Sequence, residues 1–432
     1  MIKPHHIIFG SMLLLLTACS EIKPPPSEKS FIAISAGESH TCGLVQGGAA
    51  YCWGDNSSGG LGNNSPILAS LHPDAVAATL DGTLLSFTSI STGLYFTCGL
   101  TTGGKAFCWG DNRFGQLGNG TIKDVKVPVA VLPPAGEQSL SFSSISTGID
   151  STCGLTLIGK AYCWGGNEFG QLGNNTTVTA NIPVEVSAPK NGNALSFKQL
   201  SVGSFFVCGL ILDGTGYCWG SNERGALGNN GLTPSGNSTN FSTLPIAIAA
   251  PANENPLAFS NISAGSSHVC GLTVVGAAYC WGANFYGELG NGTAQPGIPV
   301  QATLRPVAVA APSGGNILTF TSITTGSIQT CGLTSIGTVY CWGRNPSGQL
   351  GNNSITDSLF PVLVSPTKKG LIVNFAIIST HLGAHTCGVS STGKPYCWGT
   401  NVNGALGNDF LEGDDGQPIN YSKVPNPVYP IY

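Results

Sequence analysis

Short runs of alternating apolar and polar residues recur along most of the chain. In residues 87–91, Phe-Thr-Ser-Ile-Ser alternates as a half-buried strand does. Residues 98–101 and 105–109 flank Thr-Gly-Gly, which predicts a hairpin, and Pro128–Val131 adds a fourth short strand. No helical period of useful length follows the N-terminal region. The pattern therefore predicts an all-β protein.

The same strand pattern is repeated seven times. Each copy opens with Cys-Gly-Leu (once Cys-Gly-Val), carries a second Cys ten positions later, and continues with Trp-Gly-x-Asn and Leu-Gly-Asn. The first cysteines of successive copies lie 56, 55, 55, 62, 61 and 56 residues apart. About four strands per copy, joined by Gly-rich turns, predict a seven-bladed β-propeller over residues 31–432.

The two ends of the chain suggest how this ring closes. A Pro-Val-type strand lies between most copies, as at Pro183-Val184 and Pro306-Val307. The first copy begins at Phe31 with no such strand before it, whereas Pro427–Ile431 ends the chain with no repeat after it. We therefore predict that the N- and C-terminal strands share a blade, because this pairing would remove two open sheet edges.

The paired cysteines predict a disulfide in each hairpin. Opposed residues in an antiparallel pair lie at a spacing that a disulfide can bridge. Free buried thiols are the alternative, and zinc is disfavoured because no histidine pair accompanies the cysteines. The predicted pairs are Cys42 with Cys52, Cys98 with Cys108, Cys153 with Cys163, Cys208 with Cys218, Cys270 with Cys280, Cys331 with Cys341, and Cys387 with Cys397.

The N-terminal region resembles a bacterial lipoprotein signal. Lys3 precedes a short apolar run, and Leu16-Thr17-Ala18-Cys19 resembles a lipobox. We predict a signal peptide over residues 1–18, a lipid on Cys19 and a Pro-rich tether over residues 19–30. Lipidation of Cys19 also explains why the number of cysteines, 15, is odd. The predicted location is the bacterial cell envelope, with the outer membrane favoured because Ser20 follows the cysteine; an ordinary secretory signal is the alternative.

Composition and motifs disfavour several classes of function. Charged residues make up 9% of the chain and the net charge is −4, so we expect no nucleic-acid partner. The sequence contains no nucleophile elbow, HExxH pair or phosphate loop. His40, His268 and His385 share one repeat register, where a structural hydrogen bond is the expected role. We therefore predict no enzyme activity, no cofactor and no metal.

The repeats resemble those of the regulator of chromosome condensation (RCC1) family. The matching stretches are Ala36–Leu44 (AGESHTCGL) and Trp109–Gly118 (WGDNRFGQLG), and the likeness covers about residues 31–432. The resemblance implies a seven-bladed propeller whose terminal segments share a blade. The paired cysteines depart from the usual family repeat and suggest an exported variant. The family's founding member is a guanine-nucleotide exchange factor that binds chromatin, while a secreted bacterial relative inhibits β-lactamases through loop aromatics on one face.

Differences between the copies indicate where a partner could bind. The tryptophans occur in every copy and are expected to pack between blades, whereas two loops vary from copy to copy. Exposed loop aromatics are preferred interface anchors. The candidates are Tyr95, Phe96, Phe205, Phe206, Phe114, Phe169, Arg224 and Tyr286. Packing between blades is the alternative role for several of them.

These observations lead to one functional hypothesis with two alternatives. We predict a monomeric, lipid-anchored scaffold that binds a protein or a surface glycan through loops on one face. The alternatives are an enzyme with a site at the mouth of the central channel and, by family analogy, a regulator of nucleotide exchange.

Overall fold

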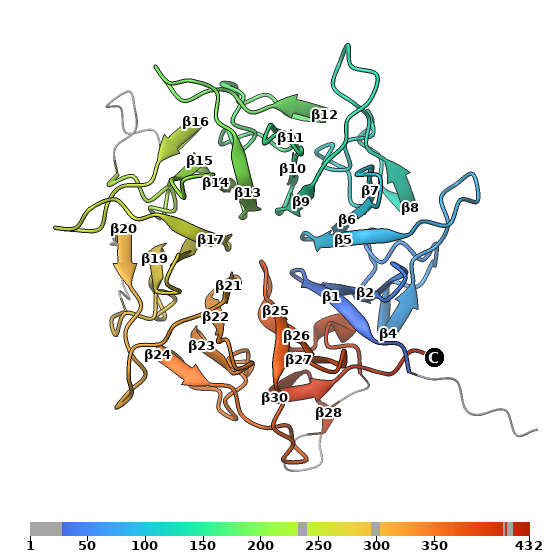
Figure 1. Cartoon of the computed structure of the whole chain (residues 1–432). Coiled ribbons are helices and arrows are strands. Elements are labelled where there is room, and N and C mark those ends of the chain that lie inside the picture. Colours follow the sequence, from blue (N-terminus) through green and yellow to red (C-terminus); the bar gives the residue numbers. More distant parts are fainter. Residues whose placement is uncertain (1–27, 232–239, 295–302, 409–410, 413–417) are drawn as a thin grey trace, which may run out of the picture.

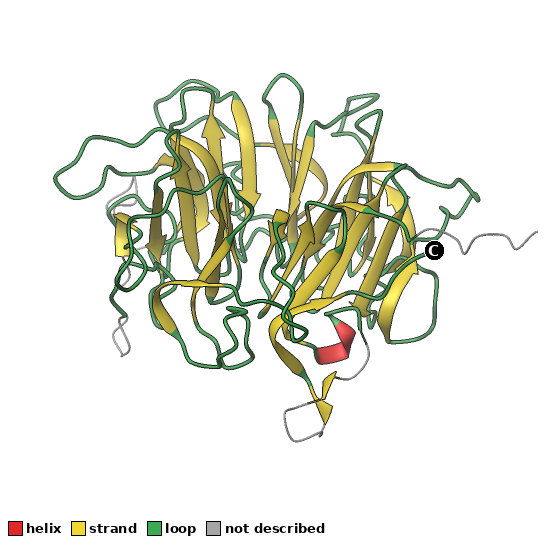
Figure 2. Ribbon diagram, turned by 60° about the horizontal axis from the view of Figure 1, so that its bottom comes forward, coloured by secondary structure: helices red, strands yellow, loops and turns green. Residues whose placement is uncertain are grey.

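Seven four-stranded antiparallel sheets stand around a central axis (Figure 1). The computed structural model describes residues 28–231, 240–294, 303–408, 411–412 and 418–432. In each sheet the strands follow in chain order from the axis outward, and Figure 2 shows the resulting disc from the side. The predicted seven-bladed propeller is confirmed. Among the described residues, no helix is both long and apolar enough to cross a membrane.

The strands fall into four classes by their position in the blade. The inner strands are β1 (Phe31–Ala36), β5 (Phe87–Thr92), β9 (Ser144–Thr147), β13 (Phe197–Val202), β17 (Phe259–Ala264), β21 (Ser322–Thr325) and β25 (Phe375–Ser379). The second strands are β2 (His40–Val45), β6 (Phe96–Thr101), β10 (Ser151–Leu155), β14 (Phe206–Ile211), β18 (His268–Thr273), β22 (Gln329–Leu333) and β26 (His385–Ser390). The third strands are β3 (Ala50–Asp55), β7 (Ala106–Gly110), β11 (Ala161–Gly165), β15 (Gly216–Ser221), β19 (Ala278–Gly282), β23 (Val339–Gly343) and β27 (Pro395–Thr400). The outer strands are β4 (Ala69–Ala75), β8 (Val125–Ala130), β12 (Ala180–Glu185), β16 (Phe241–Ala247), β20 (Thr303–Ala308), β24 (Ser358–Leu363) and β30 (Tyr421–Pro427). The last blade also carries the 3-10 helix η1 (Val402–Gly404) and the short ladder of β28 (Leu411–Glu412) with β29 (Pro418–Ile419).

The predicted sharing of a blade by the two chain ends is wrong. The first blade is β1–β4 and the last is β25–β27 with β30, so each blade uses strands from its own copy. The Pro-Val-type strand that follows each hairpin is the outer strand of the same blade. In the first copy this outer strand is β4. The chain ends still meet, because the Lys29 backbone N–H donates to the Ile431 carbonyl at 2.7 Å.

Hydroxyl groups close the ring around the axis. At every blade junction a Ser or Thr oxygen of one inner strand accepts a hydrogen bond from a backbone N–H at or just after the end of the next inner strand. The acceptor and donor residues are Ser35 with Thr92, Ser91 with Thr147, Ser146 with Val202, Ser201 with Ala264, Ser263 with Thr325, Thr324 with Thr380, and Ser379 with Ala36. The last of these bonds, at 3.0 Å, joins the seventh blade to the first.

The seven tryptophans join neighbouring blades, as predicted. Each indole is fully buried and donates its N–H to a backbone carbonyl in the preceding blade, at 2.9–3.1 Å. The donor and acceptor residues are Trp53 with Ala405, Trp109 with Gly60, Trp164 with Gln116, Trp219 with Gln171, Trp281 with Ala226, Trp342 with Glu288, and Trp398 with Gln349.

The paired cysteines lie directly opposite each other on the second and third strands of every blade. In the first blade, for example, the two Cα atoms of the pair are 4.1 Å apart. All fourteen residues are fully buried, and these bonds lie inside the blades, so they stiffen each hairpin rather than the junctions. The disulfides join Cys42 with Cys52, Cys98 with Cys108, Cys153 with Cys163, Cys208 with Cys218, Cys270 with Cys280, Cys331 with Cys341, and Cys387 with Cys397. The pairing is the one expected from the spacing of ten, and the alternative of free buried thiols does not apply to these residues.

Glycines at the ends of the inner strands allow adjacent blades to approach closely. A Cβ atom added to Gly148 would lie 2.5 Å from the Gly203 carbonyl oxygen of the next blade, and one on Gly93 would lie 2.5 Å from the Gly148 oxygen. Because the obstructing atoms are backbone, they cannot move aside as a flexible side chain would. The Gly in the repeated turn is thus required by the packing of blades around the axis.

Replacement of this glycine should destabilise the ring. We expect Gly148→Ala to lower the free energy of unfolding by about 1–3 kcal/mol, which is the usual cost of overpacking. Urea denaturation measures the change. Gly103→Ala is the matched control, because a Cβ there would meet no atom within 4 Å. Equal losses in the two variants would contradict the proposed close approach.

Candidate binding face

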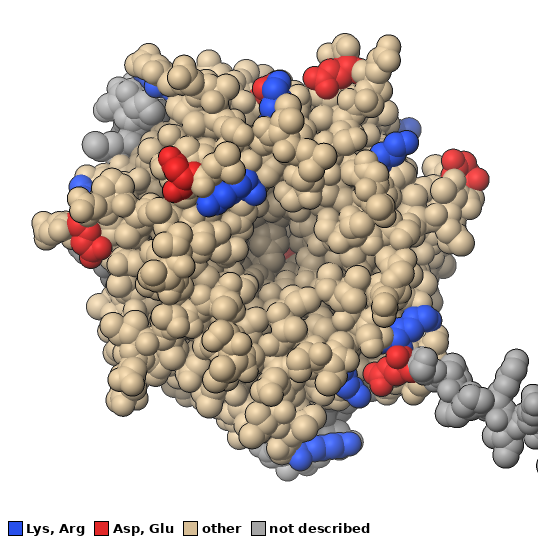
Figure 3. Space-filling model, viewed as in Figure 1, with Lys and Arg blue, Asp and Glu red and all other residues tan. Residues whose placement is uncertain are grey.

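The two variable loops of each copy lie at the same end of the disc. One is the turn between the inner and second strands, and the other is the loop between the third and outer strands. Backbone bonds hold them together: the Asp111 N–H donates to the Tyr95 carbonyl at 3.0 Å, and the Ser221 N–H to the Phe205 carbonyl at 2.8 Å. We call this end the loop face; it is the lower end in Figure 2, where η1 lies. The opposite end, formed by the hairpins between second and third strands, is the hairpin face, seen in Figures 1 and 3.

An asparagine, buried in six of the seven blades, shapes each long loop of the loop face. The Asn112 Oδ1 atom accepts a hydrogen bond from the Leu117 N–H at 3.0 Å, while its Nδ2 donates to the Lys123 carbonyl at 3.1 Å. The residues directly after the asparagine are thereby displayed on a constant frame. The Asn–Leu bond recurs in every blade, and its members are Asn56 with Leu61, Asn112 with Leu117, Asn167 with Leu172, Asn222 with Leu227, Asn284 with Leu289, Asn345 with Leu350, and Asn401 with Leu406.

Aromatic and arginine side chains of adjacent blades stack on this frame. The rings of Phe169 and Phe205, from the third and fourth blades, are 5.4 Å apart and tilted by 56°. The guanidinium carbon of Arg224 lies 4.9 Å from the centre of the Phe285 ring in the fifth blade. Both arrangements are favourable, because tilted rings avoid repulsion between π faces and a cation is attracted to a π face.

The stack continues into the sixth blade. Arg344 lies 4.5 Å from the centre of the Tyr286 ring, and Tyr286 is next to Phe285, with 6.4 Å between ring centres. We call the whole set the aromatic–arginine arc. Its members are Phe169, Phe205, Arg224, Phe285, Tyr286 and Arg344.

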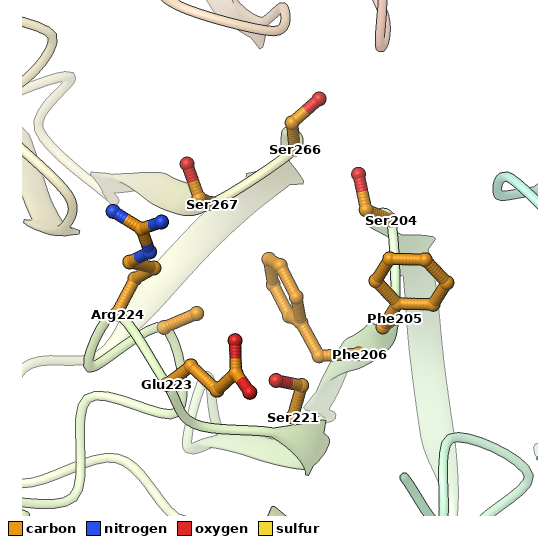
Figure 4. A pocket seen from close by; sticks show the side chains of 9 residues that line it. Ser204, Phe205, Phe206, Ser221, Glu223, Arg224, Ser266 and Ser267 are labelled. Carbon is orange, nitrogen blue, oxygen red and sulfur yellow. The ribbon is translucent and has the colours of Figure 1, made fainter. Parts of the chain in front are cut away.

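A pocket of about 170 Å³ interrupts the arc between the fourth and fifth blades. Figure 4 shows the Phe206 ring between Phe205 on one side and Arg224 on the other, with the hydroxyls of Ser204 and Ser266 along the rim. The Ser204 hydroxyl is buried without a hydrogen-bond partner. The pocket therefore has an apolar floor, one cation (Arg224), one carboxylate (Glu223) and an unpaired hydroxyl, and its volume is that of one side chain.

The structure separates the predicted site residues into two groups. It brings Phe169, Phe205, Arg224 and Tyr286 into the arc. Phe114 and Tyr95 lie beside it in the second blade, where Phe114 is 45% exposed.

Phe96 and Phe206 are corrections to the predicted set. The exposed fractions of their side chains are 0% and 2%. Each is the first residue of a second strand, and its ring packs against the turn glycine of its own blade, Gly93 or Gly203. Both rings are therefore core residues rather than interface anchors, although Phe206 forms the floor of the pocket.

Sequence reasoning missed two members of the arc. Phe285 lies in a variable loop but is not among the predicted anchors, and neither is Arg344. The sequence does distinguish Arg344 from its counterparts. At the same position of the repeat, between Trp-Gly and Asn, other copies carry small or acidic residues such as Asp111 and Ser221.

Two buried carboxyl groups support the loop face. Burial raises the pKa of Asp150 to about 6. Burial also raises the pKa of Glu288, whose Oε2 accepts the Tyr286 N–H at 2.8 Å. In other blades a glutamine accepts this bond, as Gln116 does from Phe114. Glu288 thus positions the backbone of the arc.

His381 occupies the loop-face end of the central channel. Its Nδ1 lies 3.2 Å from the Thr92 carbonyl and its Nε2 lies 2.8 Å from the Val202 carbonyl, so one ring bridges the second, fourth and seventh blades. The turn that carries it, Thr380–His385, is one residue longer than its counterparts. Burial lowers the pKa of His381 and favours the neutral ring, which carries one N–H and so donates to one of these two carbonyls. Within the described ranges, no three His, Cys, Asp or Glu residues are arranged to hold a metal ion.

The three histidines that share a register form hydrogen bonds between blades, as predicted. The His268 Nε2 lies 2.8 Å from the Thr330 hydroxyl, which itself donates to the Glu288 carbonyl at 2.9 Å. The imidazole is therefore the donor to the hydroxyl, and its Nδ1 is buried without a partner. Burial lowers the pKa of His268 and His385 to about 3 and that of His40 to about 4.

These pKa values predict that the fold loses stability in acid. The unfolded chain binds protons on histidine near pH 6.5 whereas the folded chain does not, so stability falls as the pH drops from 6.5 toward 4. Each histidine contributes a slope of about 1.4 kcal/mol per pH unit. Between pH 6.5 and 5, His268→Gln should lose about 2 kcal/mol less than the wild type, as measured by urea denaturation at each pH. The raised pKa of Asp150 makes stability rise as the pH falls, but this effect is the same in the wild type and in the His268→Gln variant. Parallel stability curves would contradict the prediction.

Comparison with known proteins identifies the repeats. Two family models, both described as the regulator of chromosome condensation (RCC1) repeat, match the chain. One matches residues 31–59, 87–116, 142–171, 259–288 and 320–349. The other matches residues 103–155, 159–210, 213–272 and 337–388.

Curated relatives and solved structures agree with this match. The ultraviolet-B receptor UVR8 of Arabidopsis thaliana is 29% identical over 394 residues, which cover 90% of this chain and 81% of the receptor. The human E3 ubiquitin-protein ligase HERC2 is 25% identical over 85% of this chain, but the matched region is 7% of that ligase. Yeast RCC1 (Prp20) bound to Kap60 has the same fold, with a TM-score of 0.70, 18% identity, and coverage of 97% of this chain and 91% of that one.

Proposed function

The chain belongs to the regulator of chromosome condensation (RCC1) repeat family, and from this premise we propose that it is a scaffold that binds a partner protein through its loop face. Within such a fold, positions that are constant between blades hold the ring together. Positions that vary on one face are free to specify a partner.

The observation that carries this proposal is the aromatic–arginine arc. Tyr and Arg are enriched among residues that dominate binding energy in protein interfaces. Stacking of Arg224 and Arg344 on rings of the fifth blade restricts both side chains before a partner arrives, so less conformational entropy is lost on binding. The neighbouring pocket, lined by Phe206 and Ser204, fits one side chain of the partner.

Related proteins support a role in protein binding. Prp20 was solved in complex with Kap60, and a second structure of the yeast protein is described together with its binding to Gsp1p and histones. The identity of 18% indicates a shared fold and not a shared partner. The partner of this chain is therefore expected to be set by the arc and not by family membership.

We further propose that the scaffold is a lipoprotein of the bacterial cell envelope. Residues 1–27 lie outside the described part of the structure, so Cys19, the signal peptide and most of the tether remain predictions from sequence. Their support is the apolar run followed by Leu16–Cys19, together with fourteen further cysteines that all pair within the repeats.

Removal of two arc side chains should weaken capture of the partner. We expect the double variant Arg224→Ala, Tyr286→Ala to recover roughly tenfold less partner than the wild type from envelope extracts, because two anchors are lost. Quantitative mass spectrometry of the captured proteins measures this. Lys190→Ala with Leu84→Ala, one cation and one aliphatic residue of the hairpin face, is the matched control. Unchanged recovery by the arc variant would reject the loop face as the site, and loss of binding after glycosidase treatment would indicate a glycan.

Lipid attachment depends on one sulfur atom. A lipoprotein carries a diacylglycerol on the cysteine, and more than one acyl chain is needed for stable anchoring. We expect Cys19→Ser to give an uncleaved precursor or a released soluble protein, detected by membrane fractionation and N-terminal mass analysis. A Cys19→Ser protein that is processed normally and stays in the membrane fraction would show that the anchor is not a lipid on Cys19.

A further inference from the structure

Exposed aliphatic side chains cap the hairpins of four consecutive blades. The tips of blades three to six carry residues whose exposed fractions range from 73% to 87%. We call them the aliphatic crescent, which consists of Leu157, Ile158, Leu212, Val274, Val275 and Ile336. The other three blades have polar tips at the same place, with Gln46, Thr102 and Ser391. The crescent therefore covers one side of the hairpin face.

Rigid hairpins hold these side chains in place. In the third blade the Gly159 N–H donates to the Thr156 carbonyl at 3.0 Å, and the Thr156 N–H donates to the Lys160 carbonyl at 2.9 Å. The disulfide of that blade, Cys153–Cys163, lies directly below the tip. Because these backbone groups are already bonded within the hairpin, transfer of the tip to an apolar medium would leave few of them unsatisfied.

A second group of exposed aliphatic residues lies on the hairpin face, outside the crescent. In the connection from the sixth to the seventh blade, Leu371 and Ile372 are exposed and follow Lys368 and Lys369. Figure 3 shows that Lys, Arg, Asp and Glu residues are sparse on this face, and some form opposite-charge pairs, such as Lys160 with Glu185. Aliphatic side chains next to lysines are typical of surfaces that lie in a membrane interface, where the lysine stems also become buried.

The chain preceding the ring leaves from the same face. The Phe31 N–H donates to the Gly393 carbonyl in the hairpin of the seventh blade at 2.9 Å. Glu28 lies 3.8 Å from Lys394 in that hairpin. Residue 28, the first described residue, is thus beside the polar hairpin tips, across the face from the crescent. The preceding segment therefore joins the ring at the hairpin face and not at the loop face.

We propose that the aliphatic crescent docks on the surface of a phospholipid bilayer. The choice of a bilayer over another occupant rests on the proposed lipid anchor and on the exit of the chain from this face. The anchor and the crescent then hold opposite sides of one face against the membrane. In this orientation the loop face, with its aromatic–arginine arc, is directed away from the bilayer toward a partner.

The test uses residues 28–432, because all seven blades and the bonds that close the ring lie within them. This protein lacks Cys19, so it reports on the crescent independently of lipidation and of partner binding. We expect it to co-sediment with vesicles of equal parts phosphatidylethanolamine and phosphatidylglycerol. The triple variant Leu157→Ser, Leu212→Ser, Val275→Ser should reduce the partition coefficient at least tenfold, since each side chain that inserts contributes several-fold.

The matched control changes aliphatic residues of the loop face that are 62–70% exposed. The triple variant Ile67→Ser, Ile122→Ser, Val178→Ser should bind vesicles as the wild type does. If the triple variant unfolds, Leu212→Ser alone replaces it, and we expect this single change to lower the partition coefficient several-fold. Absence of vesicle binding by the wild-type ring, or equal binding by the crescent variants, would overturn the proposal. Wild-type dimers in sedimentation velocity that the crescent variant cannot form, without vesicle binding, would assign the surface to a second copy instead.

Discussion

The hydrogen bond from each tryptophan to the preceding blade is the interaction on which the ring depends. Its acceptor carbonyl lies in the loop that the buried asparagine shapes, so the bond requires the loop and the neighbouring blade together. In five junctions the same carbonyl also accepts a threonine hydroxyl, as the Glu288 carbonyl does from Thr330 at 2.9 Å. A buried carbonyl left without either donor would carry the full cost of desolvation.

This dependence explains why the loop face can vary without loss of the fold. The asparagine, leucine and tryptophan positions satisfy the buried polar groups, while the residues after each asparagine point outward and touch little of the core. Four of the arc residues, Phe169, Arg224, Phe285 and Tyr286, follow such an asparagine. Arg344 lies directly before Asn345, and Phe205 lies in the turn before a second strand. Blades three to six, which build the arc, also carry the aliphatic crescent at their opposite ends, where the other three blades have polar hairpin tips.

The positions of the histidines show how one repeat register can serve different purposes. His40, His268 and His385 bond to threonines across blade junctions, whereas Phe96 and Phe206 fill the same register with apolar rings. His381 belongs to none of these, because a single added residue places it at the axis. Its partners, the Thr92 and Val202 carbonyls, come from blades that are distant in sequence. No pattern in the sequence indicates such a contact.

The sequence by itself determined the repeat, the number of blades, the opposed cysteines and the packing role of the tryptophans. These features follow from local periodicity and from identical positions in every copy. Tertiary structure decided the rest, because it depends on contacts between copies. It assigned the last strand to its own blade, buried Phe96 and Phe206, and brought Arg344 onto Tyr286 across a junction. A side chain's exposure and its neighbours are set by the blade beside it, and that blade lies more than fifty residues away in the chain.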